Sequence, residues 1–222
     1  MLMNTSAFAV TGPGQFHIRT FDTAQTGGWR DKKQAEEQLR RNVKRMAALQ
    51  DRFYAQDREA LLLIFQAMDS AGKDGAIKHV MSGLNPQGVQ VSSFKQPSAE
   101  DLEHDYLWRV NRRLPERGNI GIFNRSYYEE VLVARVHDLP FAQKLPARCL
   151  DDGLWERRYR QLRDYERYLT ENGTTVIKFF LHISKEEQRR RFLARIEDKA
   201  KNWKFSASDI AERAHWDAYM RA

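Results

Sequence analysis

A short apolar strand that runs straight into a loop with glycine and lysine most constrains the fold of this 222-residue chain. The run from Ala60 to Phe65 is continuously apolar, which is typical of a strand buried on both faces of a sheet. The next residues, up to Gly75, are Gln-Ala-Met-Asp-Ser-Ala-Gly-Lys-Asp-Gly, and a helical pattern covers 73–82. The N-terminus of such a helix presents unpaired N–H groups to an anion, so the junction predicts a phosphate-binding loop.

The loop departs from the common nucleotide-binding pattern G-x-x-x-x-G-K-[ST] at two of its four fixed positions. Gly72 would let the backbone curl around a phosphate, and Lys73 would bridge the outer phosphate oxygens. Ala67 and Asp74 stand where the pattern has glycine and a hydroxyl residue. From the pattern alone, the alternative is a strand-to-helix turn that carries an exposed lysine.

Asp69 indicates that a metal ion takes part in binding. A carboxylate inside a phosphate loop repels the ligand unless a cation lies between them. The hydroxyl that usually binds Mg²⁺ after the lysine is replaced here by Asp74. Asp69 is therefore predicted to be a direct Mg²⁺ ligand, and the alternative role for it is to cap the following helix.

Strand-like and helix-like segments alternate along the chain, which predicts one α/β domain over 1–222 with a parallel sheet. Residues 1–30 are expected to form an irregular arm, because glycines interrupt any periodic pattern there. The expected strands are 60–65, 89–94, 119–123 and 174–181. The expected helices are 31–57, 73–82, 98–114, 126–136, 150–171, 184–200 and 206–220.

The charge balance favours an anionic partner. Lys and Arg number 37 against 30 Asp and Glu, which gives a net charge of +7 and suits nucleic acid, nucleotide, polyanion or anionic membrane. The single cysteine, Cys149, excludes an intramolecular disulfide and any multi-cysteine metal site. The apolar runs are too short to cross a bilayer and the N-terminus lacks a signal-peptide pattern, so a cytoplasmic location is expected.

A second polar cluster follows the strand-like segment 119–123, at the end of a strand where open α/β sheets bind ligands. Asn124 stands where such sites usually have an aspartate, and its amide oxygen is a weaker partner for Mg²⁺. Arg125 is predicted to bind a phosphate through two hydrogen bonds, and a salt bridge to a local carboxylate is the alternative. Glu129 and Glu130 open the next helix, where acids suit the helix dipole, and Glu129 is expected to lie nearer the site.

The segment 184–205 is predicted to be a basic lid. Between 184 and 204, eight bases stand against four acids. Arg191 and Arg195 are four residues apart and share a helix face. A mobile lid that closes over phosphates would exclude water from the site, whereas for any single residue the alternative is a solvated, charged helix.

These segments together resemble the polyphosphate kinase 2 family, from about Phe21 to the end of the chain. Four ordered segments of this length are highly specific. The resemblance implies a P-loop kinase fold of the thymidylate-kinase-like type: a parallel sheet flanked by helices, with a helical lid and a basic channel for inorganic polyphosphate. The matching segments are Phe65–Gly75, His104–Arg109, Gly121–Val133 and Lys201–Ser206.

The resemblance also implies a Mg²⁺-dependent, reversible transfer of the terminal phosphoryl group of polyphosphate to a nucleotide. The Asn-Arg-Ser-Tyr-Tyr-Glu form that starts at Asn124 is similar to the branch that uses both nucleoside monophosphates and diphosphates. ADP and AMP are then the expected acceptors and ATP the product. Many members have Asp-Arg here and asparagine in place of Glu129, so the departure at Asn124 leaves metal binding more dependent on Asp69. Members also continue past Met220 with a further strand and helix, whereas this sequence stops at Ala222.

Carried over by position, the resemblance assigns roles to individual residues. The expected catalytic residues are Asp69, Lys73, Arg125, Glu129 and Arg191, with Asp69 as the metal ligand. The expected nucleotide- and polyphosphate-binding residues are Ser70, Ala71, Gly72, Asp74, Gly75, Lys78, Asn124, Arg189, Arg190, Arg195 and Lys204. His79, His104 and His137 have no metal-ligand spacing and are assigned structural roles.

Two other functions stay open from the residues alone. An ATP-dependent nucleoside monophosphate kinase would share the fold, although such kinases usually place their phosphate loop near the N-terminus. A non-catalytic binder of polyanions or nucleic acid would fit the net charge, but such a surface gains nothing from Asp69 at its centre. No nucleic-acid or membrane partner is therefore expected. The apolar stripe of helix 31–57 is expected to serve a homo-oligomer interface.

Overall fold

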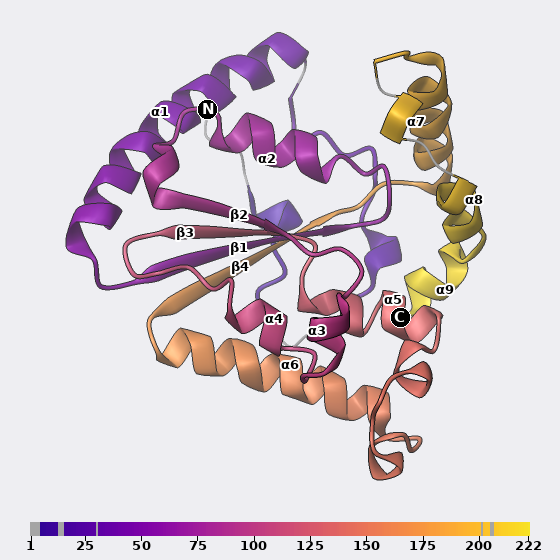
Figure 1. Ribbon diagram of the computed structural model, residues 1–222. Helices are drawn as coiled ribbons and strands as arrows, with labels where there is room; N and C mark the ends of the chain where they lie inside the picture. The colour runs from indigo at the N-terminus through magenta and orange to yellow at the C-terminus, as the bar shows by residue number, and fades with distance from the viewer. Residues whose placement is uncertain (1–4, 13–15, 30, 201, 205–206) are drawn as a thin grey trace.

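A parallel four-stranded sheet lies at the centre of the computed structural model (Figure 1). Its strands are β1 (Ala60–Ala67), β2 (Val89–Ser93), β3 (Ile120–Asn124) and β4 (Thr174–Leu181), in the order β2-β3-β1-β4. All three pairings are parallel, as the alternating sequence pattern predicts. The residues that the structure describes are 5–12, 16–29, 31–200, 202–204 and 207–222.

β1 lies between β3 and β4 and is buried on both faces. Leu62 and Ile64 are fully buried on one face, while Phe65 packs on the other face with Ile122. The register pairs Phe65 of β1 with Asn124, the last residue of β3, while β1 continues to Ala67, so the two strands end at the same edge of the sheet. The loop that follows β1 and the polar segment that follows β3 are therefore neighbours at one edge of the sheet.

Helices cover both faces of the sheet (Figure 1). α1 (Lys32–Gln56) and α2 (Lys73–Met81) cover one face, and α3 (Ala99–Leu102), α4 (Trp108–Asn111) and α6 (Leu154–Glu171) cover the other. In the described part of the chain, no helix is both long and apolar enough to cross a membrane.

The helices after β4 gather at the loop end of the sheet (Figure 1). They are α7 (Lys185–Glu197), α8 (Ala207–Ala214) and α9 (Trp216–Arg221). Trp216 is buried in a cluster with Ala71 of the loop. The final helix is thus packed directly against the predicted phosphate loop.

The segment expected to be an arm, 1–30, contains two short 3-10 turns, η1 (Thr5–Phe8) and η2 (Ile18–Thr20). Residues 1–4, 13–15 and 30 lie outside the described residues. Residues 16–19 line the cavity at the loop end of the sheet, so the arm reaches the candidate site.

The helix predicted over 98–114 is wrong, because the segment forms α3 and α4 with a turn between them. Ser98 and Asp101 cap the start of α3 reciprocally, each side chain accepting a hydrogen bond from the other residue's backbone N–H. The carboxylate of Asp105 then accepts from the N–H of Leu107. These local bonds compete with the helical ladder and interrupt it.

The helix predicted over 126–136 is also wrong. The segment forms the 3-10 turn η4 (Tyr127–Glu130) and the short helix α5 (Val133–Val136). The Ser126 hydroxyl accepts from the backbone N–H two residues on, which favours the tighter turn. Leu132 then leaves the helical region with φ −107° and ψ −85°.

Three other helix boundaries differ from the predictions, while the remaining helices and the four strands are confirmed within a few residues. α6 begins at Leu154 rather than near 150, because the Asp151 carboxylate forms a turn with the N–H of Gly153. α7 ends at Glu197, since Asp198 is extended. The stretch 206–220 is divided at His215 into α8 and α9.

The packing beside the sheet is tight at Gly121 of β3, where it can be tested by substitution. A Cβ at this position would lie 2.9 Å from ring carbons of Pro115, which cannot move aside as a flexible side chain can. We expect Gly121→Ala to lower the free energy of unfolding by about 1–3 kcal/mol. Gly75→Ala is the matched control: its Cβ meets nothing within 4 Å, and alanine favours the interior of α2 by roughly 0.5–1 kcal/mol. Urea unfolding of both variants measures the difference, and equal stabilities would contradict the packing argument.

Candidate active site

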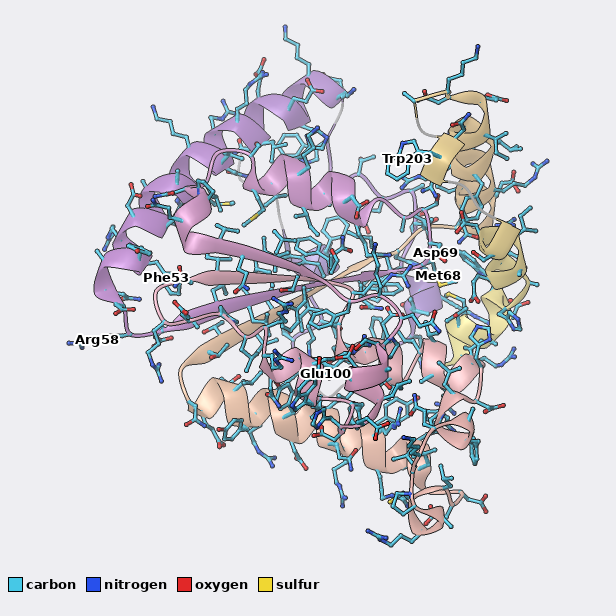
Figure 2. The ribbon with its side chains drawn as sticks, viewed as in Figure 1. Phe53, Arg58, Met68, Asp69, Glu100 and Trp203 are labelled. Atoms are coloured by element: carbon cyan, nitrogen blue, oxygen red, sulfur yellow. The ribbon has the colours of Figure 1, made fainter. Side chains whose placement is uncertain are left out.

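The loop between β1 and α2 bends through two residues with positive φ. Ser70 has φ +63° and Gly72 has φ +100°, and Gly72 directly precedes α2. A Cβ on Gly72 would also lie 3.2 Å from the guanidinium of Arg191. Glycine thus serves both the backbone conformation and the close approach. Arg58 precedes β1 at one end, and the loop, with Met68 and Asp69, follows β1 at the other end (Figure 2).

The hydroxyl oxygen of Ser70 is buried and has no hydrogen-bond partner among the described residues. Leaving a buried polar group unpaired costs about 1–3 kcal/mol, so such atoms cluster where a ligand completes the site. Ser70 lies in the middle of the loop, as the sequence predicts for a ligand-binding residue.

Lys73 begins α2 and is largely buried. Its ammonium group donates a hydrogen bond to the carbonyl of Ala67, 3.0 Å away, so it spans the mouth of the loop. Burial lowers the pKa of Lys73 below the ordinary lysine value, and the positive charge of Arg125 lowers it further. The carboxylates of Asp69 and Glu129 oppose this shift but do not cancel it.

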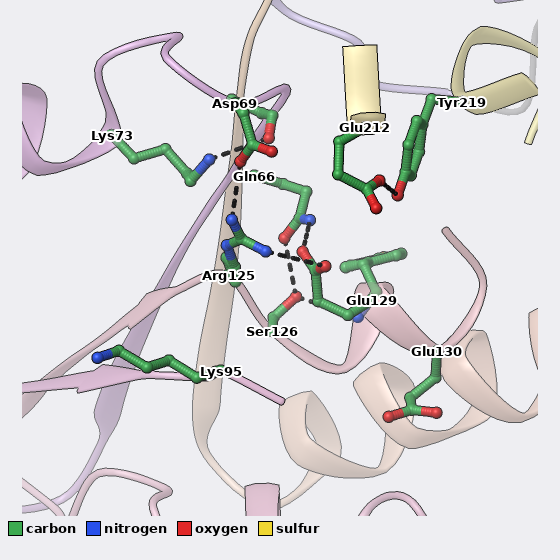
Figure 3. Close-up of polar contacts among 12 residues, drawn as sticks. Gln66, Asp69, Lys73, Lys95, Arg125, Ser126, Glu129, Glu130, Glu212 and Tyr219 are labelled. Carbon is green, nitrogen blue, oxygen red and sulfur yellow. Dashed lines mark hydrogen bonds and ion pairs between the residues drawn. The ribbon is translucent and has the colours of Figure 1, made fainter. Parts of the chain in front are cut away.

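Arg125 links the loop to the segment after β3. Its guanidinium lies 2.8 Å from a carboxylate oxygen of Asp69 and 3.6 Å from one of Glu129 (Figure 3). The backbone of Arg125 has φ +64° and is held by a hydrogen bond from its N–H to the carbonyl of Phe65. The structure thus brings together Asp69, Lys73, Arg125 and Glu129, four of the five predicted catalytic residues.

Gln66 was not among the predicted site residues, yet it joins this cluster from the end of β1. Its amide nitrogen donates to the carboxylate of Glu129, and its amide oxygen accepts from the hydroxyl of Ser126 at 3.4 Å (Figure 3). Gln66 is buried although it is polar, and it directly follows the apolar run from Ala60 to Phe65. That polar residue at the end of a buried strand was the available signal.

Asn124 and Asp74 contact each other rather than standing apart. The amide nitrogen of Asn124 donates to the carboxylate of Asp74 at 2.8 Å, which leaves the amide oxygen of Asn124 as an acceptor. Gly75 and Lys78 follow on the exposed side of α2. The predicted binding residues of the loop and of β3 therefore lie around one loop end.

Arg191 is the predicted lid residue that reaches the loop. Its Nη1 donates to the backbone carbonyls of Ala71 at 2.7 Å and Ser70 at 3.2 Å, and its Nε donates to Glu187 at 2.7 Å. In this arrangement the guanidinium contacts the backbone of the loop from outside. Its predicted contact with phosphate stays a prediction.

Three other predicted lid residues form ion pairs outside the loop. Arg189 pairs with Glu186 and Arg190 with Glu187, both on the exposed surface of α7, while Arg195 lies 3.8 Å from Asp209. Residues 201 and 205 and the side chain of Lys204 lie outside the described residues. Trp203 is 74% exposed and lies on the side of α7 that faces α2 in Figure 2.

A cavity of about 1900 Å³ opens beside the loop. One wall carries Asp69, Arg125 and Glu129, and another carries Glu212 and Tyr219 from the C-terminal helices (Figure 3). Its volume is sufficient for a nucleotide together with several phosphates. No sequence pattern predicts Glu212 or Tyr219 as site residues, because only the packing of α8 and α9 places them here.

Glu212 is held by two neighbours that span different elements. It accepts a hydrogen bond from Tyr219 at 2.7 Å and lies 3.0 Å from the imidazole of His137, next to α5. Partial burial raises the pKa of Glu212, but these hydrogen bonds outweigh burial and bring the pKa below its usual value. His137 also lines the cavity, and its predicted structural role stays a prediction.

Glu130 is buried away from the cluster and pairs with two arginines. Its carboxylate lies 3.3 Å from Arg158 and 3.4 Å from Arg109, and Arg158 also donates to the Glu130 carbonyl at 2.8 Å. Burial raises the pKa of Glu130, while the two arginines oppose that shift. This network anchors η4 and so fixes the neighbouring Glu129.

The oxygen ligands available suit a metal ion that is shared with a phosphate. In the described ranges, no three His, Cys, Asp or Glu side chains are arranged to hold a metal by themselves. Mg²⁺ in phosphoryl-transfer sites is commonly bound by one or two carboxylates plus substrate oxygens. One oxygen of Asp69 pairs with Arg125, and the buried Ser70 hydroxyl and the amide oxygen of Asn124 lie on the same loop end. These residues fit such a shared ion.

Comparison with known proteins agrees with this geometry. Residues 29–222 match the family model described as Polyphosphate kinase 2 (PPK2). An ADP-polyphosphate phosphotransferase from Rhodopseudomonas palustris is 52% identical to this chain, in an alignment that covers the whole chain and 78% of that protein. An AMP/ADP-polyphosphate phosphotransferase from Meiothermus ruber is 43% identical, in an alignment that covers 97% of this chain and 77% of that protein. The crystal structure of a polyphosphate kinase 2 from Arthrobacter aurescens superposes with a TM-score of 0.85 at 42% identity, over 95% of this chain and 72% of that one. The fold is thus the P-loop kinase-like α/β fold.

The lowered pKa of Lys73 predicts an alkaline limit to phosphate binding. The protonated ammonium attracts the anion, so affinity falls as pH rises through the pKa of Lys73, below the ordinary value of 10.5. Titration of tripolyphosphate against the protein between neutral pH and pH 10.5 measures this fall. Lys73→Arg keeps its charge across the range, so its affinity should stay flat. If the affinity of Lys73→Arg still fell with rising pH, another titrating group would be responsible for the fall.

Proposed function

The chain belongs to the polyphosphate kinase 2 family, and on this premise we propose that it transfers the terminal phosphoryl group of inorganic polyphosphate to nucleoside diphosphates and monophosphates. The observation that carries the proposal is the contact of Asp69 with Arg125 beside Lys73, at the mouth of a nucleotide-sized cavity. Two cations and a carboxylate at one loop end suit the transfer of a phosphoryl group, whose negative charge must be neutralised.

The proposed mechanism is direct in-line transfer. An oxygen of the acceptor's terminal phosphate attacks the terminal phosphorus of polyphosphate, and the bridging P–O bond to the rest of the polymer breaks. The shortened polyphosphate leaves with the bonding electrons. Lys73 and Arg125 hold the oxygens of the group in transfer, and the N–H groups at the start of α2 orient it. No side chain has to act as a base, because the attacking oxygen is already an anion.

We propose Mg²⁺ as the cofactor, held by Asp69. When bound there, the ion would neutralise charge on the phosphates and relieve their repulsion from the Asp69 carboxylate. The carboxylate lies at the loop, with 31% of its side chain exposed toward solvent, so it is accessible to an ion that arrives with a phosphate. Glu129 is less exposed and is tied to Gln66, which favours Asp69 as the principal ligand.

The choice of acceptor follows from the relatives and from the segment after β3. The relatives above are named for ADP alone and for AMP and ADP together. The motif from Asn124 to Glu129 resembles that of the branch that uses both acceptors. Glu129 lies in the wall of the cavity and is fixed by Gln66 and Arg125. We therefore propose both ADP and AMP as acceptors and ATP as the final product.

The two rival functions have less support. A non-catalytic polyanion binder would not need Asp69 and Glu129 beside its two cations. An ATP-dependent nucleoside monophosphate kinase would share the fold, but the named relatives use polyphosphate. We also propose a cytoplasmic homo-oligomer, with nucleotides supplied by the cytoplasm and the exposed Leu49 and Tyr54 of α1 at the interface.

The function is tested by supplying polyphosphate as the sole phosphate donor. With long-chain polyphosphate and Mg²⁺, we expect ATP to form from ADP and, through ADP, from AMP, measured by chromatography of the nucleotides. ATP from ADP alone would retain the phosphotransferase and refute the dual acceptor. Phosphorylation of AMP by ATP but not by polyphosphate would instead establish the rival kinase.

Asp69→Asn separates metal binding from polymer binding. We expect kcat to fall by roughly 10²–10³-fold or more, because the amide no longer neutralises or positions the ion. Polyphosphate binding, measured by titration, should stay largely intact, since Lys73 and Arg125 remain. Asp51→Asn makes the same change on the exposed surface of α1 and should keep wild-type turnover. Normal activity of Asp69→Asn would refute the assignment of the metal ligand.

A further inference from the structure

Three consecutive backbone carbonyls of the phosphate loop accept hydrogen bonds from helix α7. The carbonyl of Asp69 accepts from the Gln188 side chain at 3.0 Å. The next two, of Ser70 and Ala71, accept from Nη1 of Arg191 at 3.2 and 2.7 Å. Both donors come from one face of the helix that the sequence predicts to be a lid.

Gln188 is the buried member of this contact, with an exposed fraction of 2%. Its amide oxygen accepts from Arg213 of α8 at 2.9 Å, and Arg213 also donates to the carbonyl of Lys185 at 2.6 Å. An arginine can only donate, so Arg213 fixes the amide oxygen of Gln188 on its own side. The NH₂ group of Gln188 must then face the loop, where it meets the Asp69 carbonyl.

The direction of these carbonyls matters for binding an anion. A loop that holds phosphate has to turn its N–H groups toward the ligand, because a carbonyl oxygen that faces the ligand repels it. Turning the carbonyls outward buries them against α7, where each one lacking a donor would destabilise the arrangement. Ser70, with its positive φ, lies in the middle of the three. The donors from α7 therefore stabilise the orientation that phosphate requires.

We propose that Gln188 is a positioning residue that braces the phosphate loop, with Arg213 orienting its amide and Arg191 supporting the next two carbonyls. The inference rests on the phosphate-binding role of the loop proposed above. It gives α7 a function besides covering the substrate: the first turns of the helix hold the loop in its binding shape before any ligand arrives. Gln188 also borders the cavity, but it is 2% exposed and both ends of its amide are engaged by protein groups, so we expect its effect on an anion to pass through the loop.

The test measures binding of tripolyphosphate to the protein without nucleotide, by calorimetric titration. Gln188→Met keeps the length of the side chain and removes both hydrogen-bonding groups. We expect the Kd to rise about tenfold or more, because the Asp69 carbonyl loses its donor. KM for polyphosphate should rise with it in turnover assays. Gln56→Met, at an exposed helical position beyond the far end of β1, is the matched control and should leave both values unchanged.

Arg213→Met provides an independent test, because it leaves the Gln188 side chain and its contact with the Asp69 carbonyl in place. We expect a smaller rise in Kd, about threefold, because the Gln188 amide can then rotate. In the double variant the effect should equal that of Gln188→Met alone, since both changes act through one amide. Additive effects would show that Arg213 acts elsewhere.

A folded Gln188→Met protein with wild-type affinity would overturn the proposal. If that variant fails to fold, wild-type affinity of Arg213→Met would overturn it instead. The proposed function is judged separately, by turnover of the wild type. A wild-type protein that binds tripolyphosphate through a braced loop but forms no ATP would refute the function and leave the brace standing.

Discussion

The position of β1 between β3 and β4 is the constraint on which the rest of the structure depends. Because all three strands are parallel and end at the same edge of the sheet, the segments that leave them converge without any long connection. The loop after β1 brings Asp69 and Lys73, and the turn after β3 brings Arg125 and Glu129. A one-residue slip of β1 against β3 would separate Phe65 from its partner Asn124 and move Arg125 away from Asp69.

A second constraint is the orientation of the loop backbone. The N–H groups of the loop have to face the ligand, so its backbone carbonyls face the opposite way. There they need hydrogen-bond donors from another part of the protein. Gln188 and Arg191 supply the outside donors, and the apolar packing of Ala71 against Trp216 closes the same side. The C-terminal helices are thus part of the loop's support, which explains why a small and polar loop can keep positive φ at Ser70.

The sequence predicted the strands and the loop well, because both depend on local patterns. Apolar runs define buried strands, and a glycine–lysine pair after such a run leaves few other structures. Helices over 98–114 and 126–136 failed, since Ser98 and Ser126 bind nearby backbone groups, which periodicity does not detect. Asp69, Lys73 and Arg125 could be expected to lie close together, because they belong to the segments that follow β1 and β3. Gln188 contacts a residue 119 positions away, and only tertiary packing shows this.

The electrostatics of the site differ from those of the whole chain. The net charge of +7 attracts polyanions in general, yet carboxylates of Asp69, Glu129 and Glu212 line the cavity. Arg125 pairs with Asp69 and Glu129 in this structure, so these carboxylates compete with an incoming phosphate for its guanidinium. A divalent cation held by Asp69, as proposed above, would relieve this conflict, because it would offset the charge of that carboxylate and leave the Arg125 guanidinium for the anion. The pairing of Asp69 with Arg125 thus supports the proposal that the phosphate donor and a metal ion bind together.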